Sequence, residues 1–199
     1  MHAFYPPRFI ESDELLMRPF VEDDAQELFD ALLGDPAVTE WLVVPTHRSV
    51  ADSRSFIESC RSGWVRRTRF TWALQDKASQ RIVAAIDLKP ALPRVEIGVI
   101  TSQRPGHQRR RAGLQTLRKF IDWLMAQPQI FRVDAYCAPQ GAAASTMSKL
   151  GFVLEGRLLN WEARPNRNLP AGDSLLFAMT RAPIASTCSA SAPLETRTP

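Results

Sequence analysis

Hydrophobic and polar residues recur along the chain with two different periods, and the changes of period predict the order of the elements. Segment 14–19 is typical of a strand that ends at a proline. The acidic run 22–24 then favours a helix start, and apolar residues continue at helical spacing to Leu33. A second helix is expected to begin near Ser49, because Ser49 and Asp52 resemble a capping arrangement.

The middle of the chain changes to a period of two, which is typical of β-strands. Three strands are expected over 70–75, 81–88 and 95–100, arranged as an antiparallel meander. A polar loop over 102–110 follows, and then an amphipathic helix over 114–125 with one apolar face. This part of the chain therefore predicts a sheet followed by a helix that packs on it.

The remaining elements alternate between strand and helix. A strand is expected over 133–137, a short helix over 142–150, and two strands after it, one beginning near Phe152 and one over 173–179. The complete order predicts a mixed α/β sheet with helices on its faces.

The chain has 199 residues, of which 45% are hydrophobic, and this suits one domain with a tail. We expect a single domain over 1–181 and a disordered tail over 182–199, which is rich in Ala, Ser, Thr and Pro and has no apolar period. No segment has about 18 consecutive apolar residues, and no signal peptide is evident, so we expect a cytoplasmic protein without membrane contact. Three scattered cysteines exclude a disulfide framework, and we expect no metal site.

The charge balance is basic, with a net charge of +4 and a pI of 9.3. Of 25 basic side chains, four are lysines and 21 are arginines. Base composition explains such a bias, but so does an anionic partner, because a guanidinium binds phosphate in a fork. Arg104 and the run 109–111 gather just before the helix predicted over 114–125, where free N–H groups and the helix dipole favour phosphate.

Five segments in order resemble one family of enzymes. Along the chain they read LLMRP at 15–19, EIG at 96–98, QRRRAG at 108–113, KLGFVLEG at 149–156 and DSLLF at 173–177. Together they resemble the GNAT superfamily (Gcn-related N-acetyltransferases), in the RimJ/RimL-like branch of ribosomal-protein N-terminal acetyltransferases. The resemblance implies a V-shaped, mostly antiparallel sheet that splays at its central strands and holds acetyl-CoA there as co-substrate.

The resemblance also implies which residues contact acetyl-CoA. Val99, Ile100 and Thr101 would line the pantetheine arm. The residues implied to hold the pyrophosphate are Gln108, Arg109, Arg110, Arg111, Ala112, Gly113 and Leu114.

Two positions depart from the family pattern. Arg111 stands where the family has its first loop glycine, so its side chain would either block the pocket or bind the phosphates itself. The family often has an asparagine and a serine that help to hold CoA. Gln140 stands at the asparagine position and Ala143 at the serine position, and Ser145 follows two residues later. These departures leave open an alternative function, in which the chain is a catalytically degenerate module that binds an acyl-CoA or another anion.

The reaction that the resemblance implies needs a group to take the proton of the attacking amine. Glu162 falls at the family's glutamate position, so we expect it to be the base or the amine anchor, or else a surface carboxylate. Ser145 is a candidate acid for the CoA thiolate, or a residue of the first helical turn. Trp41 either shapes the acceptor pocket or anchors the core, and Trp161 either covers the acceptor site or packs.

The implied acceptor is a primary amine, on a protein N-terminus or a small molecule. Nucleic-acid binding through the arginines is a weaker alternative, because no aromatic platform accompanies them. Antiparallel edge strands would also allow a homodimer.

Overall fold

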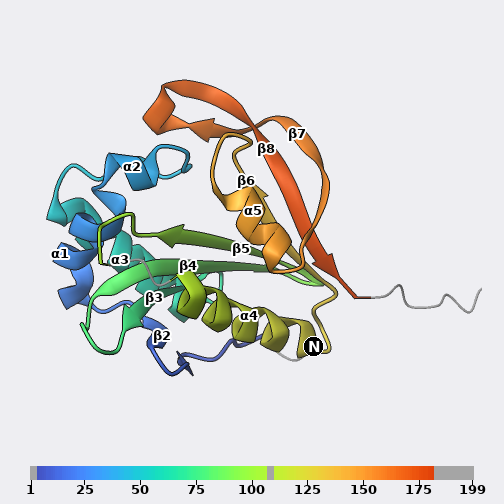
Figure 1. Cartoon of the computed structure of the whole chain (residues 1–199), viewed down its shortest axis with the longest axis horizontal. Coiled ribbons are helices and arrows are strands. Elements are labelled where there is room, and N and C mark those ends of the chain that lie inside the picture. The colour runs from blue at the N-terminus through green and yellow to red at the C-terminus, as the bar shows by residue number, and fades with distance from the viewer. Residues whose placement is uncertain (1–3, 107–109, 182–199) are drawn as a thin grey trace, which may run out of the picture.

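One eight-stranded sheet forms the centre of the molecule in the computed structural model, which describes residues 4–106 and 110–181 (Figure 1). Its strands, in spatial order, are β1 (Ile10–Glu11), β2 (Leu15–Pro19), β3 (Phe70–Asp76), β4 (Ile82–Ala91), β5 (Arg94–Thr101), β6 (Arg132–Cys137), β8 (Leu169–Thr180) and β7 (Val153–Arg164). All neighbouring strands are antiparallel except β5 and β6, which are parallel. The predicted mixed, mostly antiparallel α/β sheet is therefore confirmed.

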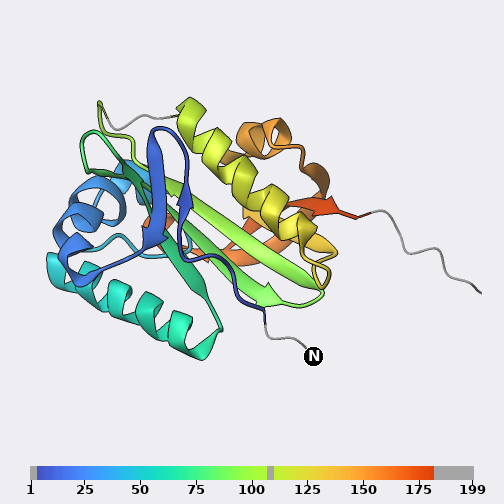
Figure 2. The ribbon, with the colours of Figure 1, turned by 90° about the horizontal axis from the view of Figure 1, so that it is seen from below.

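Helices cover both faces of this sheet. They are η1 (Glu22–Asp24), α1 (Ala25–Leu28), η2 (Phe29–Leu33), α2 (Pro36–Thr39), α3 (Val50–Arg66), α4 (Arg110–Ala126), α5 (Ala143–Lys149) and η3 (Pro165–Arg167). Figure 2 shows α3 and α4 on opposite sides of the strands. No helix in the described ranges is long and apolar enough to cross a membrane.

Two apolar cores follow from the alternation along the strands. Trp72 and Phe70 of β3 are fully buried together with Phe120 of α4. Ala73 follows Trp72 on β3 and packs with Ile57 of α3 instead. Because successive strand residues point to opposite faces, one strand supplies both cores.

The helix expected near Ser49 begins where the sequence predicts. The Ser49 hydroxyl accepts a hydrogen bond from the Asp52 amide, and the Asp52 carboxylate accepts one of 3.0 Å from the Ser49 amide. This reciprocal pair satisfies backbone donors that the first helical turn leaves free. The first predicted helix is less regular: it runs as a 3₁₀ turn, a short α-helix and then a π-helical turn ending at Gly34.

The segment KLGFVLEG at 149–156 connects α5 to β7. Gly151 has φ +88°, a left-handed conformation that glycine adopts without strain, and Phe152 beside it is buried in the core. Glu155 accepts two hydrogen bonds, of 2.9 and 2.6 Å, from the Arg132 guanidinium at the start of β6. This segment therefore fixes how β7 leaves the helix and meets the sheet.

Strands β5 and β6 pair over only three residue pairs, which end at Glu96 and Asp134. Beyond that point β5 stays paired with β4 as far as Thr101, and β6 stays paired with β8 as far as Cys137. The two strands therefore diverge, and the sheet opens at its centre as the V shape implied by the sequence.

Candidate active site

The divergence of β5 and β6 creates the first part of the candidate site. In a strand, alternate backbone groups face each neighbour, so β5 beyond Glu96 directs some N–H and C=O groups toward the opening rather than toward β4. Val99 and Ile100 are half-buried there, and Thr101 is exposed. These are the three residues expected to line the pantetheine arm, and they lie along the open part of β5.

The N-terminus of α4 supplies the second part. Arg110 and Arg111 are exposed in its first turn, whereas Ala112 is buried against the sheet. A Cβ added at Gly113 would meet no heavy atom within 4 Å, so a ligand can approach the backbone there. The first-turn N–H groups have no partner within a helix and the dipole adds positive charge, so this turn favours an anion. Gln108 and Arg109 lie outside the described residues.

A hollow of about 560 Å³ adjoins the same helix. Leu114, at the end of the predicted pyrophosphate segment, is part of its lining. Three cationic side chains also line it: Arg118, Lys119 and Lys149. The hollow therefore lies along the second and third turns of α4, beyond the arginine run, and Asp13 places a carboxylate among these cations.

The start of α5 holds two further predicted residues. Gln140 is exposed in the turn between β6 and α5. The Ser145 hydroxyl, also exposed, lies in the first turn of α5 and donates a 3.4 Å hydrogen bond to the Ala142 carbonyl oxygen. The position of Ser145 agrees with the first-turn alternative, and its exposure leaves the hydroxyl accessible.

Glu162 lies on β7 in a network that the sequence does not reveal. Its Oε2 accepts a 2.7 Å hydrogen bond from the Ser174 hydroxyl of β8 and lies 3.1 Å from a guanidinium nitrogen of Arg164. The same nitrogen donates to the Ser174 hydroxyl over 2.6 Å. Among the described residues, no hydrogen-bond donor occupies Oε1 of Glu162, and this side chain is 24% exposed. One carboxylate oxygen is held and the other is available.

Arg164 and Ser174 are the site residues that sequence reasoning missed. Arg164 is 3% exposed and Ser174 is fully buried. Burial of an arginine within a strand has no signature in local periodicity. The pairing of β7 with β8 brings these two side chains together, and that pairing is irregular between Leu158 and Glu162.

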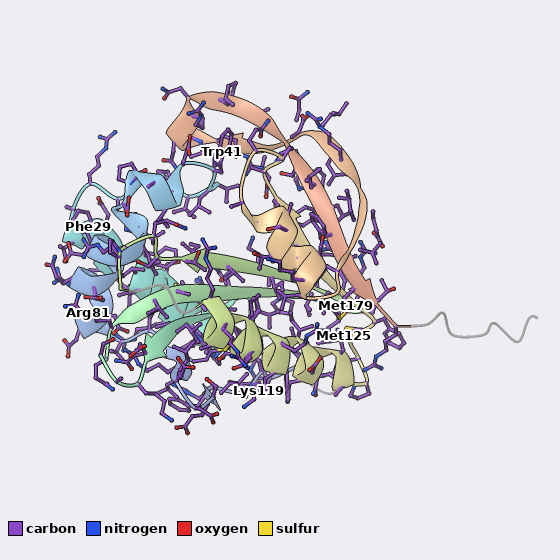
Figure 3. All side chains as sticks on the ribbon, viewed as in Figure 1. Phe29, Trp41, Arg81, Lys119, Met125 and Met179 are labelled. Atoms are coloured by element: carbon purple, nitrogen blue, oxygen red, sulfur yellow. The ribbon has the colours of Figure 1, made fainter. Side chains whose placement is uncertain are left out.

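Two tryptophans adjoin this network: Trp161 precedes Glu162 on β7, and the Trp41 carbonyl oxygen accepts a hydrogen bond from Arg164. Trp161 is 51% exposed and stacks on Tyr136 of β6, with ring centroids 5.6 Å apart. Trp41 is half-buried, and the Arg167 guanidinium lies 5.0 Å from its ring centre. Figure 3 shows Trp41 beside the β7–β8 hairpin, and Trp41 belongs to neither apolar core of the described residues.

Cys137, at the end of β6, has the environment of an unreactive thiol. Burial raises its pKa to about 11, and the negative charge of Glu162 acts in the same direction. A nucleophilic cysteine needs the opposite shift. No group of three or more His, Cys, Asp or Glu side chains in the described part of the chain is arranged to hold a metal ion.

Comparison with known proteins agrees with this architecture. Residues 14–153 match the model of the acetyltransferase (GNAT) domain family. No curated protein matches the sequence significantly. Among solved structures, RimL, a ribosomal L7/L12 alpha-N-protein acetyltransferase in complex with coenzyme A, is similar, with a TM-score of 0.73 and 17% identity over 86% of this chain and 97% of that one.

Two further solved structures are similar. The microcin C7 self-immunity acetyltransferase MccE, in complex with acetyl-CoA and AMP, has a TM-score of 0.73 and 19% identity over 85% of this chain and 94% of that one. The ribosomal-protein-S5-alanine acetyltransferase from Vibrio fischeri has a TM-score of 0.71 and 16% identity, covering 86% and 96%. At these identities the similarity establishes the fold.

Proposed function

The chain belongs to the GNAT acetyltransferase family, and from that premise we propose that it transfers an acetyl group from acetyl-CoA to a primary amine. The observation that carries the proposal is the end of β5–β6 pairing at Glu96 and Asp134, beside the exposed first turn of α4. Together these features provide free strand groups and an anion-binding helix start in one place.

The binding of acetyl-CoA is assigned to two segments. Val99, Ile100 and Thr101 would hold the pantetheine arm along the open edge of β5, and 110–114 would hold the pyrophosphate, with Gln108 and Arg109 before them. The open space at Gly113 and the exposed guanidinium of Arg111 support this assignment. The acetyl-CoA and coenzyme A complexes of MccE and RimL support acetyl-CoA as the co-substrate.

The transfer requires a neutral amine to attack the thioester carbonyl carbon, forming an amide bond as the C–S bond breaks. Backbone N–H groups of β5 that face the opening would stabilise the negative oxygen that develops. Oε1 of Glu162 would bind the amine and accept its proton directly or through water. The CoA sulfur would leave as a thiolate and receive a proton from the Ser145 hydroxyl or from water, with Gln140 holding CoA nearby.

Two measurements test this function. Acetyl-CoA should raise the melting temperature of the protein, and CoA thiol should be released when an amine panel containing peptides and small amines is added. Absence of both effects would overturn the proposal. The matched control is desulfo-CoA, which keeps the phosphates and should stabilise the protein without releasing a thiol.

Arg111 supports a second candidate, a module that binds acyl-CoA without turnover. It is exposed in the helix turn where the family has a glycine, and Ala143 stands where the family has a serine. Stabilisation by acetyl-CoA without thiol release would favour this candidate. Recovery of turnover in Arg111→Gly would then identify the arginine as the cause.

A further inference from the structure

Arginine and aromatic side chains meet on the surface between the start of the described chain and the end of α3. The Arg67 guanidinium lies 4.6 Å from the centre of the Tyr5 ring, and that of Arg8 lies 5.7 Å from the centre of the Trp64 ring. Two segments that are distant in the sequence thus build one surface. We call it the arginine–aromatic patch, and its members are Tyr5, Arg8, Phe9, Arg66 and Arg67.

The aromatic rings of the patch are exposed although the segment that carries them is fixed to the core. The Tyr5 side chain is 50% exposed and that of Phe9 61%, whereas Phe4 is buried in the larger apolar core. The Pro7 carbonyl oxygen accepts a 3.2 Å hydrogen bond from the indole N–H of Trp72. The segment is therefore anchored at two points, and a ligand that contacts the exposed rings does not have to order the backbone first.

The charge of the patch is positive and uncompensated. Its three arginines are exposed, and among the described residues no carboxylate forms an ion pair with any of them. Arg69, close by in the chain, is instead held by Asp87 at 2.6 Å. Segments 4–9 and 61–69 contain arginines but no aspartate or glutamate. These guanidinium groups therefore present a positive surface that an anionic partner would neutralise.

The patch lies at the end of the sheet opposite the candidate active site. Strand β3 starts at Phe70, which pairs with Leu88 near the end of β4. The open part of β5 ends at Thr101, which pairs with Ala84 near the start of β4. Figure 2 shows the end of α3 and the start of the described chain at one end of the molecule, and the start of α4 at the other. A ligand on the patch therefore leaves the proposed acetyl-CoA site free.

We propose that the arginine–aromatic patch binds single-stranded nucleic acid. Guanidinium groups hold phosphates in a fork, and exposed aromatic rings and guanidinium planes provide surfaces on which unpaired bases stack. The arginines at the start of α4 lack such rings, whereas here cation and ring occur together. An anionic membrane is less well matched, because Tyr5 and Phe9 are separated by an arginine and form no continuous apolar face. An acidic peptide would engage the cations alone. The inference does not depend on the proposed transfer function.

Fluorescence anisotropy with labelled U12 RNA and dT12 DNA tests the proposal, in excess CoA so that the start of α4 is occupied. Both strands should bind with a Kd of about 1 to 100 µM at physiological salt. The logarithm of the affinity should fall with the logarithm of salt concentration with a slope of about −2, as three phosphate contacts require. A duplex of equal length should bind more weakly, because its paired bases cannot stack on the rings. Stronger binding of U12 than of dT12 would identify RNA as the ligand, and equal binding would identify either strand.

Two substitutions separate stacking from charge. Tyr5→Ala should weaken binding about fivefold or more through lost stacking, with the salt slope unchanged. Arg67→Ser should weaken binding and reduce the slope by about 0.7, the share of one phosphate contact. Arg66→Ser replaces either variant if it does not fold, as its melting temperature would show. The matched control is Arg48→Ser, which removes an exposed arginine before the other end of α3 and should leave the Kd within about twofold.

Three results would overturn the inference. Oligonucleotide binding that excess CoA abolishes would place the contact at the start of α4 instead. Equal weakening by Arg48→Ser and Arg67→Ser, with no effect of Tyr5→Ala, would show diffuse attraction to a basic surface. Sedimentation with phosphatidylserine vesicles, or binding of polyglutamate, in the absence of oligonucleotide binding would assign the patch to another class of partner. Because no amine or turnover enters these measurements, their outcome is independent of whether the protein transfers acetyl groups.

Discussion

The Ser174 hydroxyl donates a 2.7 Å hydrogen bond to the Glu162 carboxylate while it accepts one of 2.6 Å from Arg164. A single hydroxyl group thus connects a buried cation to the proposed amine anchor. Because this hydroxyl has one proton, its direction is set: Arg164 donates to it, and it can donate only to Glu162. The arrangement holds Oε2, while Oε1 has no hydrogen-bond donor among the described residues.

Glu162→Gln should lower kcat/KM for the amine by about 100-fold or more, because the amide cannot accept the proton of the attacking amine. The KM for acetyl-CoA should be unchanged. Steady-state kinetics measured with varied amine and varied acetyl-CoA separate the two effects. Glu155→Gln, on the same strand and paired with Arg132, is the control and should stay within about twofold of the unaltered protein. Equal activity of both variants would remove Glu162 from the mechanism.

Ser174→Ala should lower kcat/KM by about tenfold, because Glu162 loses the bond that orients it. The loss of kcat/KM should disappear in a Glu162→Gln background, because the effects of substituting two residues that act as one unit do not add. The free energy of unfolding should also fall by about 1 kcal/mol, because the buried Arg164 guanidinium loses its 2.6 Å hydrogen bond and keeps the longer one to the Asp173 carbonyl oxygen. A double-mutant cycle of kcat/KM, accompanied by urea denaturation, distinguishes orientation from simple destabilisation. Fully additive kinetic losses would contradict the positioning role.

Arg164→Met should destabilise the fold by about 3 kcal/mol, because it removes one partner of a pair whose arginine side chain is 4% exposed. The bond to the Trp41 carbonyl oxygen is lost as well. Arg157→Met removes an arginine that is 57% exposed and should cost less than about 1 kcal/mol. Urea denaturation of both variants provides the comparison, and similar losses for the two would show that Arg164 contributes no more than a surface residue.

Arg111→Ala should raise the KM for acetyl-CoA about tenfold at low salt and leave kcat unchanged, if the guanidinium binds the phosphates. Added salt should reduce the difference between the variant and the unaltered protein, because screening weakens exposed ionic contacts. Arg61→Ala, an exposed arginine of α3, is the control and should leave both constants unchanged. A lower KM in Arg111→Ala would instead indicate that the side chain obstructs the cofactor.

Alkaline pH should destabilise the fold through its two buried thiols. Burial raises the pKa of Cys60 and of Cys137 from the usual 9.0 to about 11. A pKa that is higher in the folded state contributes stability that is fully present below pH 9 and is lost as the pH rises toward 11. Urea denaturation at pH 8, 9, 10 and 11 should show this loss, with a smaller loss in Cys60→Ala and Cys137→Ala than in the unaltered protein.

Alkylation provides a second measurement for the same thiols. At pH 8, iodoacetamide should modify Cys60 and Cys137 only after the protein is unfolded, as peptide mass spectrometry would show. Rapid modification of Cys137 in the folded protein would contradict its burial and its raised pKa.

Local signals in the sequence determined most of the elements and the position of the segment proposed to bind an anion. Ser49 and Asp52 set the start of α3 through contacts three residues apart, and the apolar stripe that includes Leu117 and Leu124 predicted α4. The cluster of arginines before that stripe pointed to the turn that the structure places at the start of α4, beside the open part of β5. Each of these inferences depends on residues within a few positions of one another, where propensity and periodicity act.

The tertiary structure alone decided how the far end of the site is built. The pairing of β8 with β7 brings Ser174 to Glu162, and Arg164 is buried where the register of that pairing is irregular. Asn166 meets a loop that precedes it by about 120 residues. Such contacts depend on strand order, register and long-range closure, which local periodicity does not encode. The sequence therefore indicated where the proposed acetyl-CoA site lies, and the packing of distant strands decided which side chains surround Glu162, the proposed amine anchor.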